Sequence, residues 1–257
     1  MVELLLIDAK WEGEIKLTDK LKKFLQEKKL KSIALFASVQ FTKLDNLIKQ
    51  IEKLGIKVNT TKARRTNEKI QILGCDCYED SFEKNIIKNS DLILYVGDGL
   101  FHPKALLLSQ IKSKEIKPII LFDPISDQIK EINKKDIEKQ IQKIKRNLRF
   151  FINSKNIGIF VTIKPWQQYF SAAKKLKEKL EKENKKAHIF IDDIINLAQL
   201  ENYPFIQTWV NTACPRIGTD DILNTEKPII NLREAMNPIK ALEELEWKKI
   251  ITTNKRN

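Results

Sequence analysis

The sequence predicts an α/β protein with two tandem domains, each built on a mostly parallel sheet flanked by helices. Short apolar runs alternate with longer amphipathic segments, which is the rhythm of repeated strand–helix–strand units. A long charged segment, residues 125–147, interrupts this rhythm near the middle of the chain, and the rhythm then starts again. The chain is 42% hydrophobic and 32% charged, which is enough apolar material for a packed core.

The first half of the chain has the clearest periodicity. Residues 32–38 (SIALFAS) form an apolar run, as expected for a buried strand. Apolar residues at positions 44, 47, 51 and 54 have helical spacing, and Gly55 is placed to end that helix. In chain order we expect strands at residues 4–7, 32–38, 56–58, 92–96 and 117–122, and helices at residues 17–29, 43–54, 82–89 and 103–111.

The second half repeats the pattern after the charged segment, which we interpret as a helical connection without a core strand. We expect strands at residues 156–163, 187–191, 204–210 and 228–230, helices at residues 169–184 and 192–200, and a further helix starting near residue 231. The boundary is placed near residue 140, which gives one α/β domain over residues 1–140 and another over residues 141–257. Ligands of open parallel sheets bind at the carboxyl ends of the strands. We therefore expect a shared site in the loops after Leu73, Val96 and Val210.

The chain is strongly basic, with a formal net charge of +13 from 47 lysine and arginine residues against 34 aspartate and glutamate residues. RNA would suit this charge. However, the lysines are spread along helices beside glutamates, and no arginine-rich cluster or base-stacking aromatic motif accompanies them. An acidic or nucleic-acid-associated protein substrate would suit the charge as well, so RNA binding is kept as an alternative.

Membrane insertion and secretion are not expected. No apolar run approaches the roughly 18 residues that span a bilayer. The amino-terminal residues, MVELLLID, have no basic region and too short an apolar stretch for a signal peptide. We therefore expect the protein in the cytoplasm, where thiols stay reduced or bind metal.

Three cysteines lie in two short segments, GCDCY at residues 74–78 and TACPR at residues 212–216. If the segments meet, Cys75, Cys77 and Cys214 form an incomplete thiolate set that suits an iron–sulfur cluster or zinc. If they do not, these are ordinary buried thiols, the commoner state of a single cysteine. Alternate residues of an extended segment point apart, so we expect only one of Cys75 and Cys77 to face the site. The chain has only two histidines, which excludes a histidine-rich metal site.

A glycine-containing turn, GDGLFHP at residues 97–103, joins an expected strand to an expected helix. Gly97 and Gly99 would let the backbone approach a ligand closely, and the following helix N-terminus favours anions. An ordinary strand-to-helix turn is the alternative. His102 is either the first polar residue of the helix or a contact in the pocket.

Charged residues surround the third cysteine. Arg216 follows Cys214 closely. Asp220 and Asp221 come four and five residues after Arg216. An arginine beside a thiolate can lower its pKa or bind a carboxylate through two hydrogen bonds. A loop with ordinary surface charges is the alternative.

These segments together resemble the diphthamide synthase family, 2-(3-amino-3-carboxypropyl)histidine synthase. The resemblance is carried by QILGCD at residues 71–76, VGDGLFHP at residues 96–103, and ACPRI at residues 213–217 followed by the two aspartates. Ser38-Val39-Gln40 and the pair Lys164 and Gln167 support it. Order and spacing agree over nearly the whole chain.

The resemblance implies a radical transferase with three α/β domains that dimerises, of which this chain matches the second and third. It implies a [4Fe–4S] cluster held by three cysteines, one from each domain, with S-adenosylmethionine on the fourth iron. The 3-amino-3-carboxypropyl group would then pass to a histidine of elongation factor 2. Cys75 and Cys214 match cluster ligands, and the residues expected around S-adenosylmethionine are Gln40, Gly97, Asp98, Gly99, His102, Arg216, Asp220 and Asp221.

The chain also departs from the family. The first domain and its cysteine are expected to be absent, so Cys77 or a separate chain would supply the third ligand. Trp166 and Ile70 stand where the family has glycines. The leading hypothesis is a subunit of diphthamide synthase that works with a second chain or as a dimer and needs an external electron donor. The alternatives are a catalytically degenerate scaffold or electron-transfer subunit, and a basic α/β RNA-binding protein.

Overall fold

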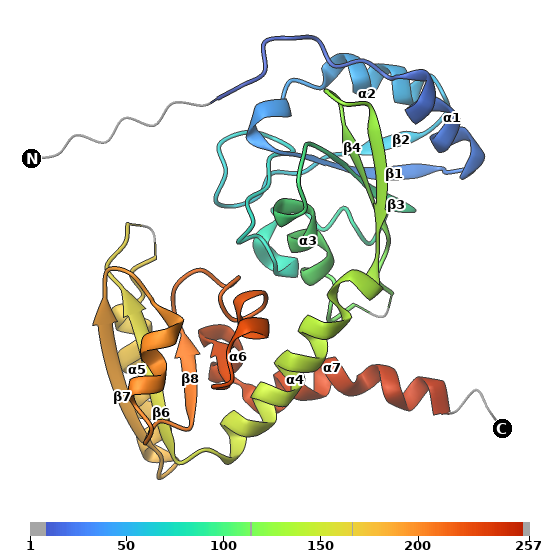
Figure 1. The fold of residues 1–257 in the computed structure, drawn as a ribbon. Helices are drawn as coiled ribbons and strands as arrows, with labels where there is room; N and C mark the ends of the chain where they lie inside the picture. Colours follow the sequence, from blue (N-terminus) through green and yellow to red (C-terminus); the bar gives the residue numbers. More distant parts are fainter. Residues whose placement is uncertain (1–8, 114, 166, 254–257) are drawn as a thin grey trace, which may run out of the picture. The chain divides into compact units, whose positions relative to one another are not determined.

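The structure is a computed structural model that describes residues 9–113, 115–165 and 167–253 (Figure 1). It divides into two compact units, one ending at Ile137 and the other starting at Glu138. The strand expected at residues 4–7 lies outside the described residues, as does Trp166. Among the described residues, no helix is both long enough and apolar enough to cross a membrane.

Unit 1 is built on a five-stranded sheet with the order β2-β1-β3-β4-β5. Its strands are β1 Ser32–Ala37, β2 Lys57–Asn59, β3 Leu92–Val96, β4 Ile119–Asp123 and β5 Gln128–Ile132, and its helices are α1 Asp19–Glu27, α2 Asp45–Glu52 and α3 Phe101–Leu108. Strands β1 to β4 are parallel, and β5 is antiparallel to β4. The side chain of Thr18 accepts from the Leu21 amide and so caps α1. The apolar faces of α1 and α2 pack on the buried strands in one core.

Unit 2 has a four-stranded parallel sheet with the order β7-β6-β8-β9. Its strands are β6 Asn156–Thr162, β7 Lys186–Asp192, β8 Thr208–Asn211 and β9 Ile229–Asn231, and its helices are α4 Glu138–Asn153, α5 Phe170–Lys182, α6 Leu232–Met236 and α7 Pro238–Thr253. Trp209 of β8 is fully buried. Its ring lies against Gly158, where a Cβ atom would come within 2.3 Å of the indole. Both units therefore confirm the predicted α/β class with parallel sheets flanked by helices.

The helix predicted at residues 82–89 is wrong. The chain instead forms a short 3-10 helix, Glu79–Ser81, and an irregular segment. The amide of Glu83 donates to the Lys62 carbonyl, and the amide of Lys84 donates to the Thr61 hydroxyl. These contacts, with an antiparallel bridge between Ala63 and Phe82, hold the start of the segment in an extended conformation instead of a helical one.

Two further expectations need correction in detail. Residues 125–147, expected to contain no strand, include β5, whose exposed, charged pattern hides it from a search for apolar runs. The helix expected at residues 192–200 is replaced by a turn and a 3-10 helix, Leu197–Asn202, which Asn196 caps through the Ala198 amide. Helix α7 was not predicted.

Candidate functional site

In unit 1, the Cys75 segment extends the sheet at the carboxyl end of β1. The Ala37 amide donates to the Ile70 carbonyl (2.8 Å), and the Ile72 amide donates to the Ala37 carbonyl (3.1 Å). Because β2 ends early, this segment occupies the place beside β1 that β2 has left. Ile70 has φ 61°, a left-handed conformation that favours glycine. This is the position where the family resemblance implies a glycine.

A tight turn then presents the cysteines. The Leu73 amide donates to Asp76 Oδ2 (2.8 Å), and the Asp76 amide donates back to the Leu73 carbonyl (3.0 Å). Cys75 is half-buried, whereas Cys77 is only 3% exposed. Burial raises the pKa of the Asp76 carboxyl, and this rise is partly opposed by the hydrogen bond from Leu73. The turn therefore leaves Cys75 as the more accessible thiol of the pair.

The glycine-containing turn after β3 lies directly against this segment. A Cβ atom at Gly74 would come within 2.0 Å of Phe101 Cε1, so the Gly-Cys-Asp segment and the Phe-His-Pro segment pack together. The ring of Phe101 is edge-on to that of His102, with centroids 5.5 Å apart. Gly99 has φ 64°, which only glycine adopts without strain.

We expect Gly74→Ala to destabilise unit 1 by about 1–2 kcal/mol, because the new methyl group overlaps the Phe101 ring. In a Phe101→Ala background the same substitution should cost much less. Urea unfolding of the four chains of this double-mutant cycle measures the coupling. Gly99→Ala is the matched control: its cost arises from backbone strain and should be the same in both backgrounds. Equal costs for Gly74→Ala in both backgrounds would contradict the packing.

Two hydroxyl groups to which the sequence assigned no role of their own lie at the same end of the sheet. Ser38 Oγ and Tyr95 OH are both buried and have no hydrogen-bond partner of good geometry among the described residues. Burial raises the pKa of Tyr95, and the nearby Ser38 hydroxyl opposes this rise in part. A buried, unsatisfied hydroxyl is costly unless water or a ligand completes its bonding. Gln40 lies on the next turn and is exposed.

In unit 2, two asparagines hold the Cys214 loop. Asn211, the last residue of β8, donates from Nδ2 to the Cys214 carbonyl (2.8 Å) and to Asn231 Oδ1 (2.7 Å). Asn231, the last residue of β9, donates to the Pro215 carbonyl (2.9 Å). Cys214 itself is half-buried. The two asparagines were not predicted; their signal was an amide side chain at the carboxyl end of a strand.

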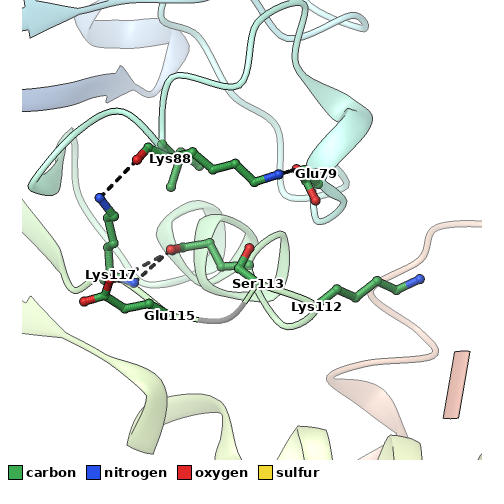
Figure 2. Close-up of a pocket in the computed structure, with 8 residues that line it drawn as sticks. Glu79, Lys88, Lys112, Ser113, Glu115 and Lys117 are labelled. Carbon is green, nitrogen blue, oxygen red and sulfur yellow. Dashed lines mark hydrogen bonds and ion pairs between the residues drawn. The ribbon is translucent and has the colours of Figure 1, made fainter. Parts of the chain in front are cut away.

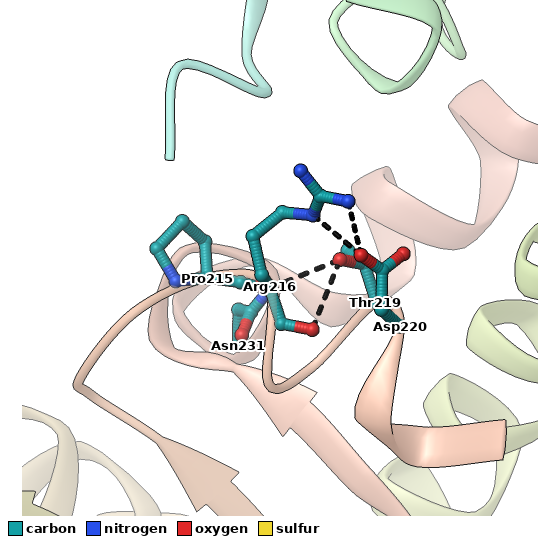
Figure 3. Close-up of polar contacts among 5 residues, drawn as sticks. All are labelled: Pro215, Arg216, Thr219, Asp220 and Asn231. Atoms are coloured by element: carbon teal, nitrogen blue, oxygen red, sulfur yellow. Dashed lines mark hydrogen bonds and ion pairs between the residues drawn. The ribbon is translucent and has the colours of Figure 1, made fainter. Parts of the chain in front are cut away.

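The Arg216 side chain forms an ion pair with Asp220 and is not exposed to solvent (Figure 3). Its Nε donates to Asp220 Oδ2 (2.7 Å), and Nη2 donates to the same oxygen. The side chain of Arg216 is 4% exposed and that of Asp220 is 25% exposed. Asp220 Oδ1 is buried and has no hydrogen-bond partner among the described residues. Asp221, by contrast, is exposed and begins a 3-10 helix, Asp221–Asn224.

The expected residues therefore form two groups, each at the carboxyl end of its own sheet. Unit 1 brings together Gln40, Cys75, Gly97, Asp98, Gly99 and His102, and unit 2 brings together Cys214, Arg216 and Asp220. Within the part of the chain that the structure describes, no group of three histidine, cysteine, aspartate or glutamate residues has the geometry of a metal site. A site shared by Cys75 and Cys214 stays a prediction.

A separate cavity of about 420 Å³ in unit 1 is a poor candidate for this chemistry (Figure 2). It is lined by Glu79, Ile87, Lys88, Gln110, Lys112, Ser113, Glu115 and Lys117. Lys117 and Lys88 precede β4 and β3, so the cavity lies towards the amino ends of these strands. Lys117 Nζ donates to the carbonyls of Lys88 and Ser90, and Lys88 is paired with Glu79. These bonds hold the wall of the cavity together.

The fold and the two loops define an α/β protein that carries half-buried cysteines at the carboxyl ends of two parallel sheets. A family model described as "Putative diphthamide synthesis protein" matches residues 4–251. The chain therefore belongs to the diphthamide synthesis protein family, which confirms the resemblance found in its motifs.

Individual relatives agree with this assignment. Over 182 residues the chain is 28% identical to 2-(3-amino-3-carboxypropyl)histidine synthase of Pyrococcus horikoshii, covering 70% of this chain and 48% of that protein. Over 206 residues it is 28% identical to 2-(3-amino-3-carboxypropyl)histidine synthase subunit 1 of Yarrowia lipolytica, covering 79% and 44%. The crystal structure of Dph2 from Pyrococcus horikoshii with a 4Fe-4S cluster matches with a TM-score of 0.69 and 26% identity, covering 90% of this chain and 64% of that one. The chain thus spans about half the length of these two sequence relatives.

Proposed function

We propose that this chain is a subunit of a 2-(3-amino-3-carboxypropyl)histidine synthase, a transferase that modifies a histidine of elongation factor 2 in the cytoplasm. The observation that carries the proposal is the pair of accessible thiols. Cys75 and Cys214 each stand, half-buried, at the carboxyl end of a parallel sheet in a chain that belongs to the diphthamide synthesis family. A solved relative with the same fold has a 4Fe-4S cluster.

The donor chemistry of these residues fits an iron–sulfur cluster, although the set is incomplete. Thiolates are the usual ligands of [4Fe–4S] clusters, which take up to four of them. Hydrogen bonds around Asp76 fix the Cys75 turn, and those from Asn211 and Asn231 fix the Cys214 loop. Such fixed loops place a ligand with little loss of entropy on binding. Cys77 is buried, so we do not expect it to be the further ligand.

The S-adenosylmethionine site would draw on both groups of residues. When bound to the protein, the cluster would supply the electron that cleaves the sulfur–carbon bond of this cofactor. The chain's own residues would bind and orient it. Gly99 allows a ligand to approach the backbone, since nothing lies within 4 Å of a Cβ added there, whereas the Tyr95 ring fills the corresponding space at Gly97. Asp98 stands on the same turn, and His102 lies in the first turn of α3.

We infer a more specific role for the Arg216 pair than the sequence suggested. Because Nε and Nη2 of Arg216 already bind Asp220, that edge of the guanidinium is not open to the cofactor's carboxylate. Asp220 Oδ1 has no hydrogen-bond partner among the described residues, and the arginine holds the carboxylate in place. We infer that this oxygen accepts from the amino group of the aminocarboxypropyl moiety. In this arrangement Arg216 positions Asp220 and balances its charge, and Asp221 stays outside the contact.

A second chain is part of the proposal because a relative is named as one subunit of its enzyme. The protein from Yarrowia lipolytica is named as subunit 1, so that enzyme has more than one subunit. Our chain matches less than half of its length. We propose that this chain likewise works with a second chain and that an external donor supplies electrons. The chain's net charge of +13 would favour docking to an acidic surface of the elongation factor.

Anaerobic reconstitution with iron and sulfide tests the proposal. We expect sulfur-to-iron charge-transfer absorption when this chain is mixed with its partner, and transfer of the 3-amino-3-carboxypropyl group to elongation factor 2 on addition of S-adenosylmethionine and a reductant. Each protein alone should show less bound iron and no transfer. A mixture that binds no iron under any of these conditions would overturn the cluster role.

The incomplete thiolate set also supports a second candidate, a scaffold or electron-transfer subunit without catalytic residues of its own. In that case the partner would hold the cluster alone. Transfer to elongation factor 2 would then survive the replacement of both Cys75 and Cys214 by serine.

A further inference from the structure

A small cavity in unit 2 is a feature that the proposed function leaves unexplained. It has a volume of about 120 Å³ and is lined by residues of β6, β7, β8 and the segment between β7 and β8. None of its lining residues is among those expected to hold the cluster or its cofactor. Because a cavity of about 150 Å³ holds a benzene molecule, this one has room for a single compact chemical group.

Four aromatic side chains from separate segments line this cavity. Phe160 pairs with Phe190 in the register of the sheet. Trp209 pairs with Gly158, two residues before Phe160, so its side chain lies on the same face of the sheet. The ring of Tyr203 is inclined by 62° to that of Phe190, with centroids 4.6 Å apart. In such an edge-to-face pair, the ring that contributes its edge keeps its faces available for another contact.

The backbone of Tyr203 is fixed, and its side chain stands at the outer side of the cavity. The Tyr203 amide donates to the Leu200 carbonyl (3.3 Å), and its carbonyl accepts from the Ile206 amide (3.0 Å) and from Lys227 Nζ (3.3 Å). Tyr203 is 36% exposed, whereas Trp209 is fully buried. The aromatic wall is therefore already in place before a ligand binds.

The charge of the cavity is opposite to that of the chain. Asp192 lines it, and because residues two apart on a strand share a face, its side chain follows that of Phe190 along β7. The Asp193 amide donates to Asp192 Oδ1 (2.8 Å), which orients the carboxylate. Among the described residues that line the cavity there is no lysine or arginine, although the chain has 47 of them. Aromatic faces attract cations, so the rings and the carboxylate favour the same kind of ligand.

We propose that this cavity binds a quaternary ammonium group, carried either by a small molecule or by a trimethylated lysine side chain. The rings of Phe190 and Tyr203 contact the cation, and Asp192 balances its charge. Ile195 and Leu200 also line the cavity and suit the methyl groups. A quaternary ammonium has no N–H group, so it leaves no donor unsatisfied against these apolar walls, whereas an unmethylated lysine would.

Titration of the full chain with choline, followed by NMR, tests the proposal. We expect the ring signals of Phe190 and Tyr203 to shift, and the methyl protons of choline to move upfield because they lie over ring faces. The matched ligand is the neutral alcohol in which a tert-butyl group replaces the trimethylammonium group of choline. It has the same shape without the charge and should bind roughly tenfold more weakly. Equal binding of the two ligands would overturn the proposal.

A peptide that carries trimethyllysine distinguishes the two sources of the group. If a modified protein is the natural ligand, this peptide should bind more tightly than choline, and the same peptide with unmodified lysine should bind roughly tenfold more weakly than the modified one. If a small molecule is the natural ligand, choline should bind at least as tightly as the modified peptide. Failure of both choline and the modified peptide to bind would rule out the site.

Substitutions in the cavity have close controls beside it. Tyr203→Leu removes a ring but keeps an apolar side chain, and should weaken choline binding roughly tenfold, whereas Tyr203→Phe should keep the affinity. Phe205→Leu is the control, because Phe205 is 51% exposed and packs against Tyr203 without lining the cavity. Asp192→Asn should weaken binding severalfold. Glu201→Gln changes an exposed carboxylate outside the cavity and should leave the affinity unchanged.

The fold of each variant is checked by circular dichroism. Wild-type affinity in both Tyr203→Leu and Asp192→Asn would contradict the proposed contacts. None of these measurements depends on iron or on elongation factor 2, so this proposal and the proposed function can fail separately.

Discussion

Replacing Cys75 or Cys214 by serine should abolish iron binding and transferase activity of the reconstituted complex. A serine hydroxyl is a far poorer ligand for iron than a thiolate, and the proposed set contains no spare accessible thiol in this chain. Both positions are half-buried in loops held by hydrogen bonds, so serine should be accommodated without unfolding. Iron content and charge-transfer absorption after anaerobic reconstitution are the measurements.

Cys77 provides the matched control within the same turn. Because Cys77 is buried, Cys77→Ser should retain the cluster, with a stability cost of about 1 kcal/mol from burying a more polar hydroxyl group. If Cys77→Ser loses iron and Cys75→Ser retains it, Cys77 rather than Cys75 is the cluster ligand. If all three single variants retain iron, we would conclude that the partner alone holds the cluster.

Removing the carboxylate of Asp220 should destabilise unit 2 by about 3 kcal/mol. Arg216 is buried, and Asp220→Ala leaves its guanidinium without the counter-charge it has in the native structure. Breaking a buried ion pair typically costs roughly 3–5 kcal/mol, and the 25% exposure of Asp220 places this case at the lower end. Urea unfolding followed by circular dichroism gives the cost, and hydrogen exchange of β6 and β8 assigns it to unit 2.

The chain offers a close control for this prediction in the same unit. Arg149 and Glu246 also form an arginine–carboxylate pair, but their side chains are 56% and 37% exposed. Glu246→Ala should therefore cost less than about 1 kcal/mol, because water replaces the lost partner. Equal costs for the two substitutions would show that burial does not strengthen the Arg216 pair. Asp220→Asn, which keeps an acceptor but loses the charge, should fall between them.

Much of the fold could be predicted because it is encoded in short-range patterns. Strands β1 and β3 are continuous apolar runs, and α2 has apolar residues at helical spacing. In each case the local pattern predicts which residues are buried. The edge strand β5 has no such pattern, since three of its five residues are exposed. The false helix at residues 82–89 had suitable local spacing, but its start pairs in an extended conformation with residues 61–63.

Some features of the candidate site could likewise be predicted from the sequence, and others could not. The sequence by itself determined the α/β class, the family motifs and the placement of Cys75 and Cys214 in loops after strands. Only the tertiary structure decided that Cys77 is buried beside an accessible Cys75, that Gly74 packs against Phe101, and that Arg216 is bound to Asp220. The physical reason is that periodicity reports which side of an element is apolar. Burial and pairing depend instead on neighbours that only folding brings together.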